Sequence, residues 1–288
     1  TYLKDADIRF GNLEGPLFDG DDSHRTKSSG PNRFLFRTPV SFASNLAQAP
    51  FNVLSLANNH AKDFGNAGLN STKQALRSLG LKYSSKDGEV AAFEIKGIRI
   101  AVIATDYYPG WRSITTPERT LNEIRTLKGS GRYHIVIVSA HSGGEGRGAE
   151  RVKPGPEIFM GENRGDVVGF SRKAIEAGAD LILMHGPHVP RAMEIYRDRL
   201  IVYSLGNFLT ERGISTAGNA GLSPLARIQL DSSGRFLKGH LASFQQVRTR
   251  GLVYDPGLQA QRLIENLSRT DFPDSAPRFE DNGFFFPR

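Results

Sequence analysis

Three apolar runs of this chain each end in a histidine, at the point where a buried strand would stop. They are residues 53–60 (VLSLANNH), 135–141 (IVIVSAH) and 181–188 (LILMHGPH). Short, nearly continuous apolar stretches are typical of strands buried in an α/β sheet, and ligands gather at the carboxyl ends of such strands. Four of the seven histidines lie at these three ends. Because imidazole is the commonest metal ligand and titrates near neutral pH, the pattern indicates a metal or acid–base site built from distant segments.

Composition narrows the class of protein without defining it. The 288 residues, 39% hydrophobic and 23% charged, are ordinary for a globular protein with a large core. No stretch approaches the roughly 20 apolar residues of a membrane helix, and the absence of cysteine excludes disulfides and thiolate ligands. The net charge of +7 is scattered, without an aromatic–basic motif, so we expect no nucleic-acid partner. That charge favours an acidic polymer or a phosphorylated substrate.

Helices alternate with strands in the first half of the chain, and hairpins dominate later. This order predicts one layered α/β sandwich. We expect a surface loop or active-site flap over 19–32, a Gly-rich loop over the site at 142–165, and a Pro-rich surface stretch from 271. The expected strands are 7–13, one from 53, 91–95, 98–105, 135–141, 180–185, 192–196, 200–204, 225–230 and 236–247, and the expected helices are 39–46, 66–79, 116–127, 169–177 and 259–267.

The motif His185-Gly186-Pro187-His188 is the most specific of the strand ends. A Gly-Pro turn between two histidines lets both imidazoles converge, which helical spacing would not do. Two surface histidines on an ordinary turn are the alternative. Paired histidines at a strand end are typical of catalytic metal sites, so metal binding is the favoured interpretation.

The motif Asn58-Asn59-His60 has two interpretations of equal weight. An amide oxygen binds a metal without adding charge, and the neighbouring histidine is free to move protons. Alternatively, the asparagines serve a turn that needs left-handed backbone, and the histidine is incidental.

Two further strand ends carry ligand-type side chains. His141 is followed by Glu145, which either orients a histidine or is an exposed loop acid. Asn12 and Glu14 supply oxygen donors directly after the first predicted strand, although a solvated turn acid is the simpler interpretation of Glu14 alone. No Gly-x-Ser-x-Gly elbow, Walker loop or dinucleotide fingerprint is present. Together, the four strand ends favour a single metal site.

These motifs, in this order, closely resemble the bacterial capsule-synthesis CapA family, which is also associated with poly-γ-glutamate synthesis. The resemblance runs from about residue 6 to 210 and implies a four-layer α/β/β/α sandwich of the metallophosphoesterase-like kind. The segments that carry it are 11–16 (GNLEGP), 56–60 (LANNH), 63–65 (DFG), the His141 segment, 178–180 (GAD), 185–188 (HGPH) and 203–208 (YSLGNF).

The resemblance also implies roles for individual residues. The expected metal ligands are Glu14 as bridging acid, Asn59, His141, His185 and His188. His60 is implied as proton donor to the leaving group, and His188 is placed with it among the catalytic residues. The supporting residues are Asn12, Asn58, Glu145 and Asn207. The ion is divalent, with Mn, Zn, Fe, Mg and Ca all left open.

The chain departs from the family pattern at two places. The family usually opens with a strand ending in Gly-Asp, whose aspartate is a metal ligand, and this chain starts after that point. The usual glycine before the His-Gly-Pro-His run is Met184. We expect a single domain over residues 1–288, without that first strand.

The leading functional hypothesis is a metal-dependent hydrolase-like enzyme of capsule or poly-γ-glutamate biosynthesis. Its expected partners are an anionic polymer, or a phosphorylated or γ-glutamyl substrate, together with membrane-bound synthase components. Two alternatives stay open: a non-catalytic accessory subunit of a polymer synthase or exporter, and a metal-assisted peptide epimerase. We expect a location in the cell envelope, periplasmic or extracytoplasmic, with an anchor in a removed segment upstream of Thr1.

Overall fold

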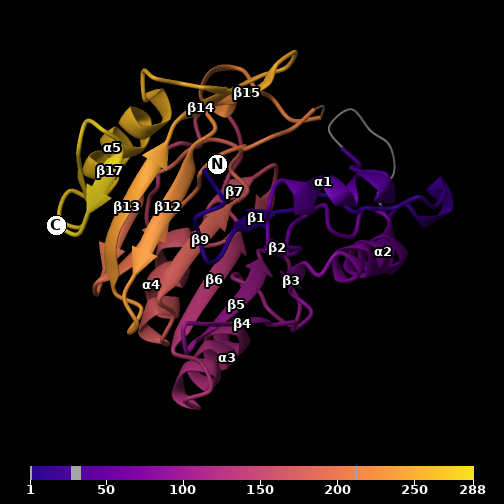
Figure 1. Ribbon diagram of the computed structural model, residues 1–288, viewed down its shortest axis with the longest axis horizontal. Coiled ribbons are helices and arrows are strands. Elements are labelled where there is room, and N and C mark those ends of the chain that lie inside the picture. Colours follow the sequence, from indigo (N-terminus) through magenta and orange to yellow (C-terminus); the bar gives the residue numbers. More distant parts are fainter. Residues whose placement is uncertain (1, 27–33, 212) are drawn as a thin grey trace.

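A computed structural model describes residues 2–26, 34–211 and 213–288 and is built around a six-stranded sheet (Figure 1). Its strand order is β10-β11-β9-β6-β5-β4. Strands β5, β6, β9 and β11 run parallel, and the edge strands β4 and β10 pair antiparallel. The bounds are β4 (Ala91–Ile95), β5 (Ile98–Asp106), β6 (Ile135–His141), β9 (Leu181–His185), β10 (Met193–Tyr196) and β11 (Arg199–Val202).

The register of this sheet brings three polar residues to one edge. Asp106 pairs with His141 across β5 and β6, and His141 pairs with His185 across β6 and β9. Because the three strands are parallel, their carboxyl ends lie side by side, which is where α/β proteins place ligands.

A second layer of smaller sheets packs against the first. One is parallel, in the order β1-β2-β3, and one is antiparallel, in the order β12-β13-β17-β16; two hairpins complete the strands. The bounds are β1 (Phe10–Asn12), β2 (Val53–Ser55), β3 (Lys82–Ser84), β12 (Leu225–Leu230), β13 (Phe236–Ala242), β16 (Arg278–Phe279) and β17 (Phe284–Phe286), with hairpins β7 (Ile158–Phe159)–β8 (Glu162–Asn163) and β14 (Phe244–Val247)–β15 (Gly251–Tyr254).

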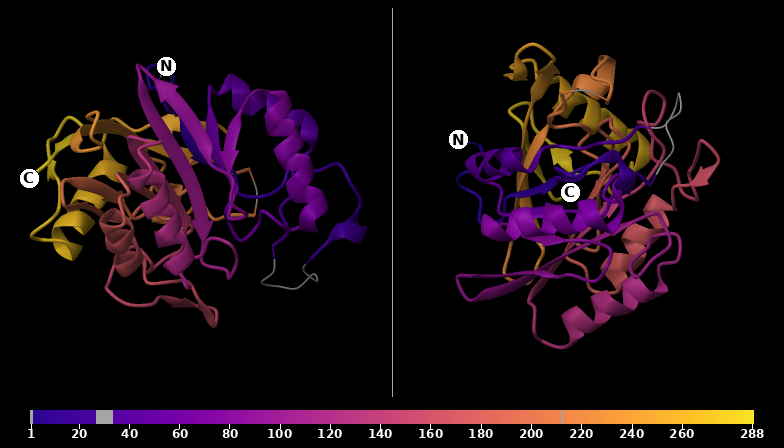
Figure 2. Two further views of the ribbon diagram at one scale, coloured as in Figure 1. Left: turned by 90° about the horizontal axis from the view of Figure 1, so that it is seen from below. Right: turned by 90° about the vertical axis from the view of Figure 1, so that its right-hand side faces the viewer.

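Helices cover the outer faces (Figures 1 and 2). One apolar core, with Ile124 and Ile182, joins α3 and α4 to the six-stranded sheet; a second, with Val53 and Phe285, lies between the sheets. A third joins α1 and α2 to β1–β3. The expected four-layer α/β/β/α sandwich is therefore confirmed. The bounds are α1 (Ala43–Gln48), α2 (Gly65–Ser78), α3 (Glu118–Gly129), α4 (Val167–Glu176) and α5 (Gln259–Asp271), with 3₁₀ turns η1 (Asp22–His24), η2 (Val40–Phe42) and η3 (Gly218–Gly221).

Local sequence explains why α4 lies where it does. The side chain of Asp166 caps the helix by accepting a hydrogen bond from the backbone N–H of Gly169 at 2.8 Å. Val167, Phe170 and Ala174 then recur at helical spacing and are buried. The helix leads directly into β9, so this cap helps to position the histidine at the end of that strand. None of the helices in the described ranges is both long and apolar enough to span a bilayer.

Two expectations about the second half were wrong. Residues 236–247 are two strands, because β13 ends at Ala242 and β14 leaves to pair with β15. At this break, the hydroxyl of Ser243 donates to Asp255 at 3.1 Å. The stretch from 271 does not simply follow the surface: it contains β16 and β17, and Phe285 is fully buried. Strands of two or three residues leave too little alternation to read from sequence.

The two expected loops also contain regular structure. The 142–165 segment is Gly-rich but includes the β7–β8 hairpin. The 19–32 segment contains η1, and its residues 27–32 lie outside the described residues.

Candidate metal centre

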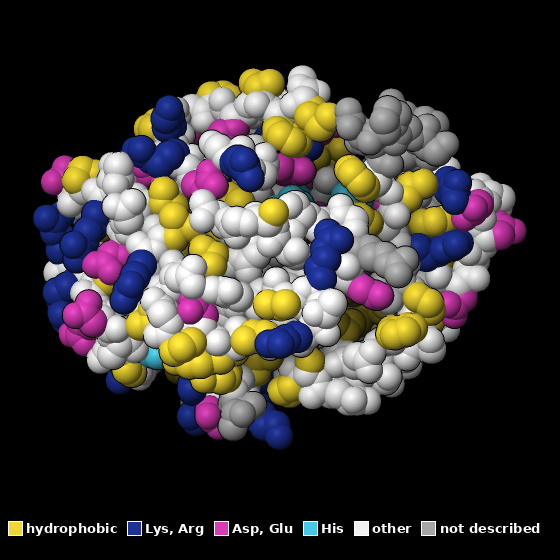
Figure 3. Space-filling view, turned by 90° about the horizontal axis from the view of Figure 1, so that it is seen from above, with side chains coloured by type: hydrophobic (Ala, Val, Ile, Leu, Met, Phe, Trp, Pro, Cys, Tyr) yellow, Lys and Arg dark blue, Asp and Glu magenta, His cyan; other side chains and the backbone are white. Residues whose placement is uncertain are grey.

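Polar side chains from three separate segments converge at the carboxyl ends of the strands. Asn58, after β2, donates a hydrogen bond to Asn12 Oδ1 at 3.0 Å and another to the carbonyl of Leu13 at 2.9 Å. Asn12 in turn donates to Glu14 Oε2 at 3.2 Å. The other carboxylate oxygen of Glu14 lies 3.6 Å from His188 Nε2, in the turn after β9. The ends of β1, β2 and β9 thus form one polar cluster, and histidine side chains are visible in a recess of the surface in Figure 3.

His141 and His185 form a close pair of imidazoles. Their Nδ1 atoms are 3.0 Å apart, and His185 Nε2 lies 2.9 Å from Ser139 Oγ. Burial, reinforced by the neighbouring imidazoles, lowers the pKa of His141 well below its usual value. Burial and His188 likewise lower the pKa of His185 to about 3. Both rings are therefore neutral at pH 7, which is the form that binds metal ions.

His188 is held in a specific orientation by Asn207. The amide nitrogen of Asn207 donates to the carbonyls of His188 and Ala220, both at 3.1 Å, so its oxygen faces His188 Nδ1 at 2.8 Å. His188 Nδ1 therefore carries the proton, and Nε2, directed at Glu14, presents its lone pair. The backbone of His188 has φ 60°, directly after the Gly-Pro turn. A left-handed non-glycine residue costs on the order of 1–3 kcal/mol and typically marks a functional site.

His60 is oriented by an aspartate that the sequence did not assign. His60 Nδ1 lies 2.7 Å from Asp63 Oδ2, and Asp63 is fully buried. The same carboxylate oxygen accepts from the backbone N–H of Phe36 at 2.7 Å, and the Phe36 ring stacks on the imidazole at 4.0 Å. Asp63 therefore fixes the tautomer of His60, with Nδ1 toward the carboxylate and Nε2 free of it. The spacing of three residues was the available sequence signal.

Two buried polar atoms of the cluster have no hydrogen-bond partner among the described residues. They are Glu14 Oε1 and His141 Nε2. Burial raises the pKa of Glu14, although the nearby His188 and His60 act in the opposite direction. An unsatisfied buried group costs about 1–3 kcal/mol, so a ligand that engages these atoms is strongly favoured.

Glu145 has a different partner from the one expected. Its carboxylate accepts a hydrogen bond from Arg164 Nη1 at 2.5 Å rather than from a histidine. Arg164 lies over the ring of Tyr107 at 4.3 Å and is almost completely buried. Glu145 therefore anchors the Gly-rich segment near the centre, and its direct role in the site stays a prediction.

The donor chemistry fits a divalent cation, although the shell is not closed. Within the described ranges, no group of three or more His, Asp or Glu side chains is arranged to hold a metal ion as it stands. The donors come as two pairs: His141 with His185 at 3.0 Å, and Glu14 with His188 at 3.6 Å. Imidazole nitrogens and a carboxylate are ligands that divalent ions bind, so the residue types fit such an ion.

The layered α/β fold and this donor set define a protein with a candidate metal centre at its strand ends. The chain belongs to the bacterial capsule synthesis protein PGA_cap family, which matches residues 1–212. The resemblance seen in the sequence is thereby confirmed.

Relatives with assigned names agree with the family. Over 240 residues the chain is 29% identical to the capsule biosynthesis protein CapA of Bacillus anthracis, covering 77% of this chain and 54% of that protein. It is 26% identical over 247 residues to the PGA biosynthesis protein CapA of Bacillus subtilis, covering 80% of this chain and 60% of that protein. A probable polyglutamine synthesis accessory protein of Mycobacterium tuberculosis is 28% identical over 218 residues, covering 65% of this chain and 54% of that protein. The chain thus spans little more than half the length of these relatives.

Among solved structures, purple acid phosphatase PPD1 from yellow lupin matches 86% of this chain and 52% of its own. The TM-score is 0.39 and the identity 12%. This similarity is too distant to support a functional argument.

Proposed function

We propose that this protein is a metal-dependent hydrolase that acts on an anionic capsule polymer, such as poly-γ-glutamate, or on its precursors in the cell envelope. The observation that carries the proposal is the buried, neutral His141–His185 pair beside Glu14 and His188. Neutral imidazoles and a carboxylate are ligands typical of catalytic divalent ions. The family membership and the relatives named for capsule and PGA biosynthesis support the substrate class.

The ion would be held by Glu14, Asn59, His141, His185 and His188. When bound, a divalent ion supplies Lewis acidity toward a carbonyl or phosphoryl oxygen. His141 and His185 enter that shell without losing a proton, because both are already neutral.

His60 provides the proton in this proposal. Asp63 Oδ2, 2.7 Å from Nδ1, orients the imidazole and leaves Nε2 free of this contact. As water adds to the carbonyl or phosphoryl centre and the scissile bond breaks, His60 Nε2 gives its proton to the leaving nitrogen or oxygen. The proton that the water loses passes to solvent. Asn58 fixes this turn by accepting the backbone N–H of His60 at 3.2 Å.

The net charge of +7 supports a polyanionic substrate. A positive protein field raises the local concentration of an acidic polymer and speeds encounter, more strongly at low ionic strength. Each residue of a γ-linked glutamate chain carries a free carboxylate, so this polymer gains from that field along its whole length.

A second candidate is a non-catalytic component of a membrane-bound polymer synthase or exporter. Two observations favour it. One relative is named a probable polyglutamine synthesis accessory protein. Among the described residues, no three His, Asp or Glu side chains are arranged to hold a metal ion. In that case the cluster would bind the polymer or an ion without cleaving a bond.

The test is metal binding and cleavage by the purified chain. Chelated protein is reloaded with Mn²⁺, Zn²⁺ or Ca²⁺, bound metal is quantified, and γ-linked penta-glutamate is incubated and analysed by mass spectrometry. We expect His60→Ala to keep the metal and lose cleavage, and the double variant His141→Ala/His185→Ala to lose both. His240→Ala, on β13, is the matched control and should keep both. Polymer binding without cleavage under every metal would reject the hydrolase in favour of the accessory role.

A further inference from the structure

A cavity of about 130 Å³ lies beside the candidate metal centre. It opens where β2, β3 and β5 end, and it shares Asn58 and Asn59 with the centre. Its other walls include the apolar side chains of Leu56 and Leu69. For scale, a cavity of about 150 Å³ accommodates one benzene ring, so this one suits a group of about five or six heavy atoms.

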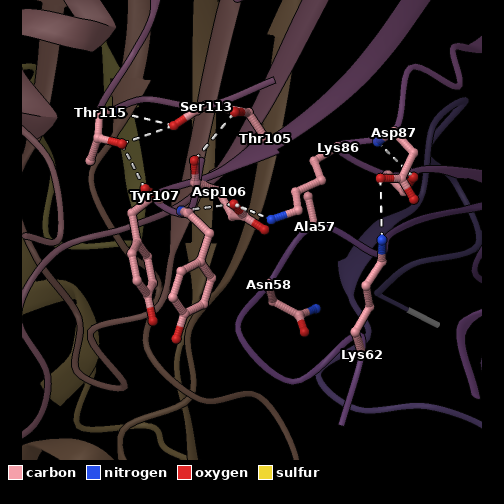
Figure 4. A network of polar contacts seen from close by, with 12 residues as sticks. Ala57, Asn58, Lys62, Lys86, Asp87, Thr105, Asp106, Tyr107, Ser113 and Thr115 are labelled. Atoms are coloured by element: carbon pink, nitrogen blue, oxygen red, sulfur yellow. Dashed lines mark hydrogen bonds and ion pairs between the residues drawn. The ribbon is translucent and has the colours of Figure 1, made fainter. Parts of the chain in front are cut away.

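Two pairs of opposite charges line this cavity (Figure 4). Lys86 Nζ lies 3.3 Å from Asp106 Oδ1, and Lys62 Nζ lies 3.5 Å from Asp87 Oδ1. Charge-assisted hydrogen bonds are normally about 2.7–2.9 Å long, so both pairs are loose. Lys73 also lies 3.7 Å from Asp87, but its own hydrogen-bond partner is Glu89. The cavity thus presents two cations and two anions that are incompletely engaged with one another.

The two pairs differ in depth. Asp106 is 1% exposed and the Lys86 side chain 18%, whereas Lys62 and Asp87 are about 40% exposed, at 41% and 39%. Asp106 is fixed by the backbone N–H of Tyr108 at 2.9 Å, and Lys86 lies 5.4 Å from the centre of the Tyr108 ring. Burying an ion pair is costly unless its geometry is excellent, and this geometry is not. A ligand that carries both a positive and a negative charge would give each member of the Lys86–Asp106 pair a second partner of opposite charge.

Charge balance decides the kind of ligand. A simple anion would be repelled by Asp87 and Asp106 about as much as it is attracted by Lys62 and Lys86. A group that carries an ammonium and a carboxylate on one carbon would instead engage both members of each pair. The head group of an α-amino acid has five heavy atoms and matches the cavity in size and in charge.

We propose that this cavity binds the zwitterionic α-amino-acid head group at the amino end of a γ-linked glutamyl chain. Internal residues of such a chain carry only the carboxylate, because their nitrogen is acylated. Lys86 and Lys62 take the carboxylate, and Asp106 and Asp87 take the ammonium. The shared Asn58 and Asn59 place the bound end residue next to the candidate centre. The proposal rests on the proposed function for its polymer and adds that the protein recognises the chain end.

Calorimetry on chelated protein tests the head group without any turnover. The probes are γ-linked triglutamate, its N-acetyl form and its form with an amide at the first α-carboxylate. Wild-type protein should bind the unmodified peptide at least about tenfold more tightly than either derivative. Asp106→Asn should lose the discrimination against N-acetylation, and Lys86→Met the discrimination against the amide.

Variants at other positions keep this test interpretable. Lys96→Met removes a lysine whose side chain is 84% exposed in the β4–β5 turn, and it should leave all three affinities unchanged. If Asp106→Asn does not fold by circular dichroism, Asp87→Asn and Lys62→Met report on the same two contacts at the mouth. Equal binding of the free and N-acetylated peptides, or no binding of either, would overturn the proposal.

The outcomes also separate the two proposals. Cleavage of penta-glutamate without any head-group preference would leave the hydrolase standing and reject the end-binding cavity. A clear preference for the free amino end, without cleavage under any metal, would support the end-binding cavity and reject the hydrolase.

Discussion

Two buried polar clusters of this protein are organised in opposite ways. Around Arg112, which is fully buried, every guanidinium nitrogen has a partner: Nε and Nη2 bond Glu123 at 2.8 and 2.5 Å, and Nη1 bonds Ser84, Ser85 and Glu89 at 2.8–3.1 Å. In the candidate metal centre, Glu14 Oε1 and His141 Nε2 have no hydrogen-bond partner within the described ranges.

The difference shows how a structural cluster is told from a functional one. Both contain charged groups taken out of water, so burial alone does not separate them. A network in which every donor and acceptor has a partner stabilises the fold. Donors and acceptors without a partner are held in place by the rest of the molecule and are available to bind a ligand. The same contrast separates the tight Arg112–Glu123 pair from the loose Lys86–Asp106 pair.

The largest effect should come from breaking the saturated cluster. Arg112→Met leaves the carboxylate of Glu123 and the carbonyl of Ser85 without their donor, so we expect a loss of about 3–5 kcal/mol in the free energy of unfolding. Urea titration followed by circular dichroism measures it. Arg197→Met is the control, since that side chain is 64% exposed, and its change should stay within about 0.5 kcal/mol. A loss at Arg112 no larger than that of the control would contradict the comparison.

Acid should destabilise the folded protein through the candidate metal centre, because the buried His185 is held there in its neutral form. The pKa of His185 is about 3 in the folded protein, below its usual value of 6.5. The unfolded chain therefore binds a proton first, and stability is lost as pH falls from about 6.5 toward 3.

His185→Asn removes this titration, so wild type should lose about 2–4 kcal/mol more than the variant over that range. Urea titrations of chelated protein at several pH values provide the measurement. Parallel pH profiles of the two proteins would contradict this prediction, because they would mean that His185 has the same pKa in the folded and the unfolded chain.

Metal should stabilise the unsatisfied cluster and leave the saturated one unaffected. At a free ion concentration of 100 times Kd, binding adds about 2.7 kcal/mol to the stability of the folded state. We expect thermal unfolding of wild type and of Arg112→Met to shift upward by similar amounts on addition of the bound ion. His141→Ala/His185→Ala should show no shift, whereas His240→Ala should behave as wild type. A shift that survives the double variant would place the ion elsewhere.

The smallest effect concerns the positioning of His60. Asp63→Asn keeps the shape of the side chain but removes the negative charge next to Nδ1. By analogy with the aspartate that orients the histidine of a catalytic triad, we expect kcat for γ-glutamyl hydrolysis to fall by about tenfold or more. KM and metal affinity should stay the same, which a merely structural defect would not produce. Steady-state kinetics and metal titration give the readouts, with Asp21→Asn in an exposed turn as control. Unchanged kcat would remove Asp63 from the proposed mechanism.

Much of the fold was readable because its signals are local. The β4–β5 hairpin and the helices α2, α3 and α4 lie within a few residues of their predicted bounds. The short strands β16 and β17 were missed, because their place in the core depends on Phe279 and Phe285 packing against distant strands. A strand of two or three residues has no periodicity of its own to reveal it.

The site was readable only as a set of strand ends. Asp106 ends β5 just as His141 ends β6, and the same rule applied to the run 98–105 would have found it. By contrast, no rule of spacing predicts that Arg164 bonds Glu145 or that Lys86 lies beside Asp106, twenty residues further along the chain. Those contacts depend on side-chain orientations set by packing.

Runs of apolar residues are local features, so the sequence indicates which segments become buried strands and that histidines, asparagines and a glutamate follow at their ends. How those ends meet depends on the tertiary structure. It placed the His141 and His185 nitrogens 3.0 Å apart, left Glu14 Oε1 without a hydrogen bond among the described residues, and opened the charged cavity beside Asn58. Distances of this kind arise from register and from packing between layers, which bring together residues as distant in the sequence as Glu14 and His188.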